Sequence, residues 1–287
     1  MTRPLVSIEN LTVAYPLGRR ILGDADMLKA VNNVSLDIPR GGFVGLVGES
    51  GSGKTTLGRA ILKAAPITGG QIIYDNGTDQ FDVGAMSKRQ EKAYRKHAQL
   101  IFQDPYAALS PRMTVRDIIA EPIELLGLTK SRAETDEMVR DIASKCRLNL
   151  EHLRRYPHAF SGGQRQRISI ARTLAARPKF VVADECVAAL DVSIQADILN
   201  LLKSLQRDLD LTILFISHDL SVVAHVCDHV AVIYLGEIVE AGPTRQLFAN
   251  PQHDYTKTLL AAIPSLDPDR KSRIPAFERG RVDVTKG

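Results

Sequence analysis

The segment from Gly48 to Thr55 limits the possible folds of this chain more than any other feature. Its residues, GESGSGKT, match the pattern G-x-x-x-x-G-K-[ST], follow the apolar run FVGLVG and precede a helix predicted to begin near Lys54. Glycines let a backbone fold around phosphate groups, and a helix N-terminus adds partial positive charge. A glycine-rich turn without a ligand is the alternative interpretation, which the strand-loop-helix context disfavours. The segment therefore predicts a nucleotide-phosphate site, which we call the phosphate loop.

Individual residues of this loop have distinct expected roles. Lys54 should reach the β- and γ-phosphates, and the Thr55 hydroxyl should coordinate Mg²⁺, so ATP and Mg²⁺ are the expected cofactors. The predicted nucleotide-binding residues are Gly48, Glu49, Ser50, Gly51, Ser52, Gly53, Lys54, Thr55 and Thr56.

Short apolar runs along the chain predict the strands of a buried sheet. They lie at 43–48, 98–102, 180–184, 212–217 and 230–235, and most are followed by segments of helix length. This alternation is typical of a parallel sheet with both faces covered. The predicted fold class is α/β, a P-loop NTPase core with a mostly parallel sheet.

Two further parts are predicted around this core. Alternating apolar and polar residues at 5–15 and 29–38, with an Asn76-Gly77 turn inside 71–82, predict an N-terminal antiparallel β subdomain. Helix-forming sequence at 114–154 predicts an inserted helical subdomain, at about 105–165. The polar end from about Ser265 is expected to be a loosely held tail.

Composition excludes several classes of protein. The 287 residues are 44% apolar, enough for one main domain, and the net charge of +4 comes from scattered basic residues, which argues against a nucleic-acid partner. The three cysteines are far apart and form no CxxC pair, so neither a disulfide framework nor a zinc site is expected. No apolar run approaches the roughly 18 residues needed to cross a bilayer. We expect a soluble chain in a reducing compartment.

A pair of carboxylates follows the strand FVVAD. Asp184 and Glu185 stand where α/β sheets usually carry their chemistry, beyond the carboxyl ends of the strands. Asp184 is suited to hold Mg²⁺, and Glu185 to accept a proton from the attacking water. A structural Asp or a surface ion pair is the alternative, which the upstream phosphate loop disfavours.

The segment FSGGQRQRISIARTLAAR, at 160–177, predicts a helix with a capping box formed by Ser161 and Gln164. Its first five residues resemble the LSGGQ signature of the ATP-binding cassette (ABC) family, with Phe160 in place of the usual Leu. The resemblance implies a nucleotide-binding domain at 1–250 and a C-terminal extension at 251–287. It also implies a dimer, in which one subunit's signature completes the ATP site of the other. The residues expected to act in trans are Ser161, Gly162, Gly163, Gln164 and Asp191.

Other segments resemble family motifs in the same order along the chain. Gln103 resembles the glutamine that contacts Mg²⁺ and water, His218 the histidine that contacts the γ-phosphate, and Tyr15 the aromatic residue that stacks on adenine. The catalytic residues implied are Glu185, His218 and Gln103; the metal ligands are Thr55, Gln103 and Asp184. Taken alone, a Gln or His at a strand end is more often an ordinary polar residue, and a core tyrosine is the alternative for Tyr15; the order of the motifs along the chain is what favours the family roles.

Longer stretches, such as RYPHAFSGGQRQRISIAR and NPQHDYTKTLLAAIP, resemble the dipeptide/oligopeptide/nickel importer group. That resemblance implies ATP hydrolysis coupled to transport at the cytoplasmic face of the inner membrane. It also implies a second ATPase subunit, identical or related, two membrane permeases and, indirectly, a periplasmic solute-binding protein. Peptide is the favoured solute, ahead of nickel, opines or glycosides.

The chain departs from the group at two places. Cys186 replaces a proline after Glu185, which frees a backbone torsion and leaves open a weakly hydrolysing or regulatory subunit. Cys186 itself is read either as a reactive thiol or, preferably, as a small core residue. No cysteine follows Cys227, so no iron–sulfur cluster is expected. An ABC ATPase acting on DNA or ribosomes is a further alternative, disfavoured because no coiled coil, zinc module or second cassette is visible.

Overall fold

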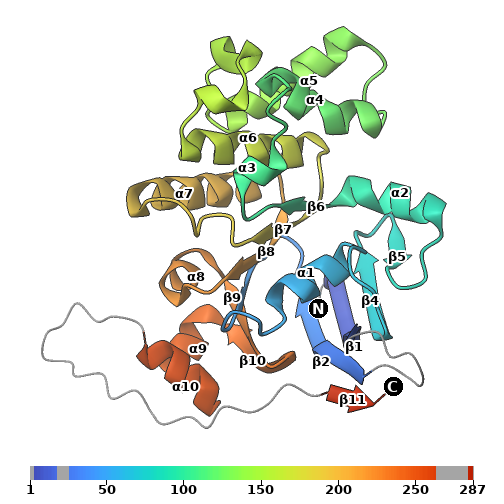
Figure 1. Cartoon of the computed structure of the whole chain (residues 1–287), viewed down its shortest axis with the longest axis vertical. Coiled ribbons are helices and arrows are strands. Elements are labelled where there is room, and N and C mark those ends of the chain that lie inside the picture. Colours follow the sequence, from blue (N-terminus) through green and yellow to red (C-terminus); the bar gives the residue numbers. More distant parts are fainter. Residues whose placement is uncertain (1–2, 18–25, 263–283, 287) are drawn as a thin grey trace, which may run out of the picture. The chain divides into compact units, whose positions relative to one another are not determined.

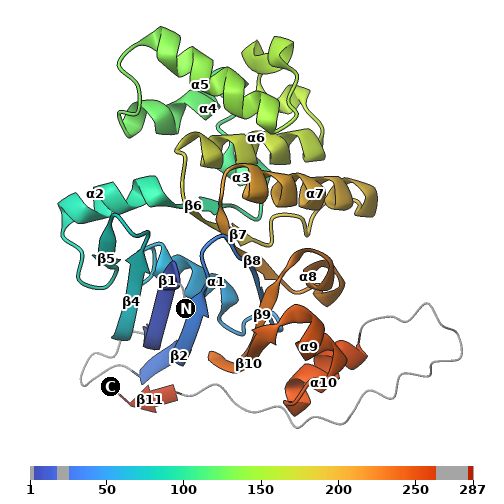
Figure 2. The same cartoon turned by 180° about the vertical axis from the view of Figure 1, so that it is seen from behind.

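The computed structural model describes residues 3–17, 26–262 and 284–286. The chain divides into two compact units, one made of the residues up to Ser87 and those from Leu214 onward, the other of Lys88–Ile213. Figures 1 and 2 label their helices and strands from opposite sides.

The first unit contains an antiparallel sheet. Its strands, in spatial order, are β11 (Val284–Lys286), β2 (Asp26–Ile38), β1 (Val6–Leu17), β4 (Gly69–Asp75) and β5 (Gln80–Asp82). In β1 the buried side chains Val6 and Ile8 alternate, as a period of two requires, whereas in β2 the buried residues Val31, Val34 and Ile38 are three and four residues apart. A register shift lies between Ile8 and Leu11. The predicted N-terminal antiparallel sheet is therefore confirmed.

The hairpin between β4 and β5 uses the predicted Asn76-Gly77 turn. The side-chain oxygen of Asn76 accepts hydrogen bonds from the N–H groups of Thr78 (2.9 Å) and Asp79 (2.7 Å). Gly77 has a φ of 90°, in the left-handed region that glycine tolerates without strain. Local sequence alone thus fixes this reversal.

The same unit holds strands in the order β10-β9-β3-β8. Their bounds are β10 (Glu237–Pro243), β9 (His229–Tyr234), β3 (Phe43–Val47) and β8 (Thr212–Ser217); the boundary between the units falls within β8. β3 runs parallel to β9 and every residue of it is buried, which explains its unbroken apolar sequence. The helices of this unit are α1 (Lys54–Ile61), α8 (Leu220–Val226), α9 (Thr244–Ala249) and α10 (Asp254–Ala261).

The second unit contains the parallel pair β6 (Ala98–Ile101) and β7 (Phe180–Asp184). The α-helices around this pair are α2 (Lys88–His97), α3 (Pro105–Ala108), α4 (Val115–Leu125), α5 (Arg132–Lys145), α6 (Gly162–Ala175) and α7 (Val192–Asp208). Two 3₁₀ turns, η1 (Leu150–Arg154) and η2 (Pro157–Ala159), precede α6. All five predicted core strands are present within one residue at each end, and the α/β class is confirmed.

Between β6 and β7 the chain is helical. Helices α4, α5 and α6 pack on one another, and α7 lies against α6 (Figures 1 and 2). Side-chain oxygens of Thr114 and Ser131 cap the N-termini of α4 and α5, which satisfies backbone donors that have no partner inside the helix.

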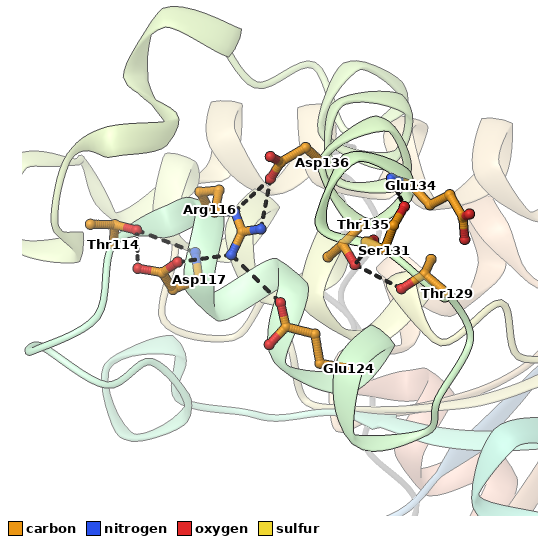
Figure 3. A network of polar contacts seen from close by, with 9 residues as sticks. All are labelled: Thr114, Arg116, Asp117, Glu124, Thr129, Ser131, Glu134, Thr135 and Asp136. Carbon is orange, nitrogen blue, oxygen red and sulfur yellow. Dashed lines mark hydrogen bonds and ion pairs between the residues drawn. The ribbon is translucent and has the colours of Figure 1, made fainter.

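A polar network ties α4 to α5 (Figure 3). The Arg116 guanidinium lies 2.7 Å from Asp136 of α5, 3.1 Å from Asp117 and 3.6 Å from Glu124. Its side chain is only 20% exposed, so these carboxylates compensate a largely buried charge.

Among the described residues, no helix is both long and apolar enough to span a membrane. The tail expected from about Ser265 lies outside the described residues except for β11, which pairs with the start of β2.

Candidate functional site

Backbone geometry shapes the phosphate loop between β3 and α1. Gly53 caps α1 with a φ of 106°, and a Cβ there would clash with the carbonyl oxygen of Ala30. A Cβ at Gly48 would clash with the carbonyl oxygen of Ile233, at the end of β9. Within the loop, the Ser52 N–H donates to the Glu49 carbonyl (3.2 Å). Both outer glycines of the pattern are therefore needed for close backbone contact.

Lys54 is buried at the first position of α1, with 4% of its surface exposed. Its ammonium group donates to the carbonyl oxygens of Gly48 (2.8 Å) and Glu49 (2.7 Å). The side chain therefore folds back over the loop and places a positive charge there, as expected for a phosphate-binding lysine. Thr55 follows it on α1 and is partly buried.

The loop also contacts the C-terminal part of the chain. The Glu49 N–H donates to the phenolic oxygen of Tyr255 on α10, at 2.9 Å. Tyr255 was not among the residues predicted for the site. Its segment, NPQHDYTKTLLAAIP, was singled out only as resembling the importer group, and no local pattern indicates a partner 206 residues away.

The two other expected residues of this unit lie at the ends of strands. His218 is exposed in the turn between β8 and α8, where the Asp219 N–H donates to Ser217 Oγ (3.0 Å) and Asp219 caps α8. Tyr15 lies in β1 opposite Leu28 of β2 and is 36% exposed. Exposure of its ring is compatible with stacking on a base.

Glu185 and Gln103 meet directly in the second unit. Gln103 follows β6 and Glu185 follows β7, and these strands are parallel neighbours. The Gln103 side-chain amide donates to Glu185 Oε2 at 3.1 Å, while Asp184, the last residue of β7, is only 7% exposed. Because carboxyl ends of parallel strands share one edge of a sheet, two distant segments bring their polar side chains together here.

The turn after Glu185 is ordered without the usual proline. The Ala188 N–H donates to the Glu185 carbonyl and the Leu190 N–H to the Val187 carbonyl, each at 3.1 Å, and Glu185 has a φ of 44°. Cys186 is 2% exposed, and burial raises the pKa of its thiol to about 12. This environment favours the core-residue interpretation over a reactive thiol.

The signature segment, residues 160–164, opens helix α6. Ser161 and Gln164 form the predicted capping box, with the Ser161 N–H donating to Gln164 Oε1 (3.0 Å) and the Gln164 N–H to Ser161 Oγ (3.3 Å). A Cβ at Gly163 would clash with Ile194 of α7, whereas one at Gly162 would meet Leu190 at an ordinary 3.7 Å. The close packing of α6 against α7 thus requires glycine at position 163, which the sequence did not reveal.

Further contacts connect this helix with its neighbours in the same unit. The Arg165 guanidinium lies over the Tyr106 ring, 4.1 Å from the centroid, and Tyr106 follows Gln103 closely in the chain. Asp191, expected to act in trans, is exposed at the N-terminus of α7.

The donor groups suit Mg²⁺ held partly by substrate phosphates. In the first unit Thr55 offers a hydroxyl, and in the second unit Asp184 and Gln103 offer a carboxylate and an amide oxygen; all three are hard ligands of the kind that Mg²⁺ prefers. Within the described ranges no cluster of three or more His, Cys, Asp or Glu side chains could hold a metal ion. Mg²⁺ is commonly bound through one or two carboxylates plus phosphates, so the residues fit it.

Comparison with known proteins gives concordant matches. The family model described as ABC transporter matches residues 31–188, and one described as oligopeptide/dipeptide transporter, C-terminal region, matches residues 239–286. A dipeptide transport ATP-binding protein of Lactococcus lactis is 50% identical, covering 100% of this chain and 94% of that protein. An oligopeptide transport ATP-binding protein of Bacillus subtilis is 46% identical, covering 98% of this chain and 87% of that protein. A dimeric ATP-binding cassette with ADP and phosphate bound has a TM-score of 0.72 at 27% identity, covering 84% of this chain and 99% of that one.

Proposed function

Because the chain belongs to the ABC transporter family, as an ATPase subunit of its dipeptide/oligopeptide group, we propose that it couples ATP hydrolysis to peptide import. The observation that carries this proposal is the phosphate loop, where buried Lys54 lies over the loop carbonyls and Gly48 and Gly53 contact neighbouring backbone. A loop of this shape at a helix N-terminus suits the polyphosphate of a nucleotide.

Each loop residue has a role in this proposal. Residues 48–56 form the phosphate site, where backbone N–H groups other than that of Glu49, which donates to Tyr255, bind the phosphates and Lys54 reaches the β- and γ-phosphates. Tyr15 stacks on the adenine. Thr55, Asp184 and Gln103 would hold Mg²⁺, which would neutralise charge on the phosphates.

Glu185 takes the proton of the attacking water, and His218 contacts the γ-phosphate. The hydrogen bond from Gln103 orients the Glu185 carboxylate, since an amide at one oxygen fixes the plane of the group. A positioned general base contributes roughly 10²- to 10⁴-fold in rate. The hydrogen-bonded turn after Glu185 supports hydrolysis despite the absence of proline at 186.

A partner cassette completes the site in this proposal. Ser161, Gly162, Gly163, Gln164 and Asp191 serve the nucleotide of a second ATPase subunit. The exposed side chains of Ser161, Gln164 and Asp191 and the dimeric state of the similar cassette support an action in trans. A helix N-terminus suits contact with a γ-phosphate.

We place this dimer at the cytoplasmic face of the inner membrane, on two permease subunits supplied by a periplasmic peptide-binding protein. The names of the curated relatives, which describe dipeptide and oligopeptide transport, support this assignment.

Uptake of labelled di- and oligopeptides by cells tests the transport function. Cells in which Glu185→Gln replaces the native chain should lose ATP-driven uptake while the permeases remain at their normal level in the membrane. Uptake at the native rate with Glu185→Gln as the only copy would contradict the proposal.

A further inference from the structure

Tyr255 connects the C-terminal region to the phosphate loop within one compact unit. Its phenolic oxygen accepts the hydrogen bond from the Glu49 N–H at 2.9 Å, across 206 positions of sequence. Glu49 follows Gly48 directly, and its carbonyl oxygen accepts from the Lys54 ammonium. The peptide groups on both sides of Glu49 are therefore held, the preceding one by Tyr255 of α10 and the following one by Lys54.

The Tyr255 ring is fixed in place. It is 1% exposed, and its centroid lies 4.2 Å from that of Tyr234 at the end of β9. The residue before Tyr234, Ile233, supplies the carbonyl that contacts Gly48. The end of β9 and the ring of Tyr255 thus support the loop together, and a packed aromatic side chain holds its hydroxyl with little freedom.

The start of α10 is itself anchored to the core. The His253 side chain caps α10 by accepting from the Tyr255 N–H at 3.1 Å. Glu240 of β10 accepts from the N–H groups of Gln252 (2.9 Å) and His253 (3.0 Å). Burial raises the pKa of Glu240, but these hydrogen bonds outweigh it and hold the pKa below its ordinary value. The hydrogen bonds from β10 through the cap of α10 to Tyr255 are continuous.

From this geometry, and resting on the proposed ATP binding, we infer that Tyr255 is a positioning residue for the phosphate loop. Its hydroxyl sets the orientation of the Glu49 peptide, and α10 thereby tunes affinity for nucleotide phosphates. The residues concerned, Glu240, His253 and Tyr255, all lie in the region matched by the oligopeptide/dipeptide C-terminal model. The C-terminal region would then act on the ATP site itself.

Tyr255→Phe tests this inference because it keeps the ring and removes only the hydroxyl. Leaving the Glu49 N–H without its acceptor should weaken ATP and ADP binding to the full chain by roughly three- to tenfold. Hydrogen exchange of the Glu49 amide should accelerate by about the same factor or more, since its protecting bond is gone. Mg²⁺-nucleotide titration and exchange measured by mass spectrometry on peptides covering 48–55 provide the two readouts.

Tyr74→Phe is the matched control. Tyr74 is fully buried in β4 of the same unit, where its ring lies against Phe81. Its substitution also removes one phenolic hydroxyl at equal burial, but at a site away from the phosphate loop. Nucleotide affinity and exchange at 48–55 should match those of the wild type.

Nucleotide affinity and loop exchange that change in Tyr255→Phe but not in Tyr74→Phe would support the inference. Unchanged ATP affinity and exchange in Tyr255→Phe, or equal changes in both variants, would overturn it while leaving the proposed function intact. Failure of the wild-type chain to bind ATP would overturn the proposed function and the inference with it.

Discussion

At the scale of single residues, two backbone carbonyl groups shape the phosphate loop. The carbonyls of Ala30 and Ile233 occupy the space where Gly53 and Gly48 would carry a Cβ. Gly51 differs from them. Its φ of 80° is also positive, but no atom lies within 4 Å of the position that a Cβ would occupy. Glycine is therefore needed in this loop for two physical reasons: some positions require a positive φ, and others leave no space for a Cβ beside a neighbouring backbone carbonyl.

Alanine substitutions separate these requirements. Gly51→Ala should lower the free energy of unfolding by about 1–2 kcal/mol, the cost of a left-handed non-glycine residue. Gly53→Ala has the same torsional cost plus a clash with the Ala30 carbonyl, and should lower it by ~3 kcal/mol or more. Urea unfolding without nucleotide measures both, and equal losses would contradict the role given to Ala30.

The cysteines are a second residue-scale test. Cys146, Cys186 and Cys227 are all buried, and burial raises the pKa of the Cys146 and Cys186 thiols to about 12. At pH 8 only about 10⁻⁴ of such a thiol is ionised. A thiol reagent should therefore label none of the three in the native chain and all three in denaturant. Rapid labelling of Cys186 in the native chain would restore the reactive-thiol interpretation.

At the scale of elements, helix α6 depends on both its cap and its packing. Gly163→Ala should destabilise the chain by ~1–3 kcal/mol because the added methyl meets Ile194 of α7. In Gly163→Ala/Ile194→Ala that clash is absent. The free energy of unfolding of the double variant should therefore fall by less than the sum of the decreases in the two single variants. Gly162→Ala is the control and should be neutral or slightly stabilising. Additive losses in the double variant would refute the packing explanation.

The contact between α4 and α5 depends on a compensated charge. Arg116→Met should lower the free energy of unfolding by ~2 kcal/mol, because Asp117, Glu124 and Asp136 lose their common cation. Lys145→Met breaks the ion pair with Asp141, in which the Lys145 side chain is 40% exposed. It should lower the free energy of unfolding by about 0.5 kcal/mol or less. Chemical denaturation of both variants at pH 7 measures the difference, and equal costs would contradict the network's role.

The same network predicts a pH dependence. A hydrogen bond from Thr114 and the Arg116 guanidinium hold the pKa of Asp117 below its ordinary value. Its stabilising contribution is therefore complete above the unfolded pKa near 4 and is lost as pH falls through the lower folded value. The difference in free energy of unfolding between the wild type and Arg116→Met should therefore become smaller below about pH 4.

At the scale of the whole molecule, features with short-range causes could be predicted from sequence. Apolar runs located the five core strands, and Asn76-Gly77 located a turn, because burial and torsional preference act within a few residues. Contacts such as Tyr255 with Glu49 and Gly163 with Ile194 could not be predicted, since they depend on packing between distant segments. The pairing of Gln103 with Glu185 is intermediate, because both follow predicted strands but their adjacency requires the strand order.

The proposed function requires that this chain bind ATP at the phosphate loop and hydrolyse it through Glu185. Turnover by the purified transporter complex carrying wild-type or Glu185→Gln chains, with ATP affinity measured in parallel, tests it most directly. Glu185→Gln should lower turnover by about 10²-fold or more, while ATP affinity should stay within about threefold of wild type. Equal turnover in the two complexes would contradict it.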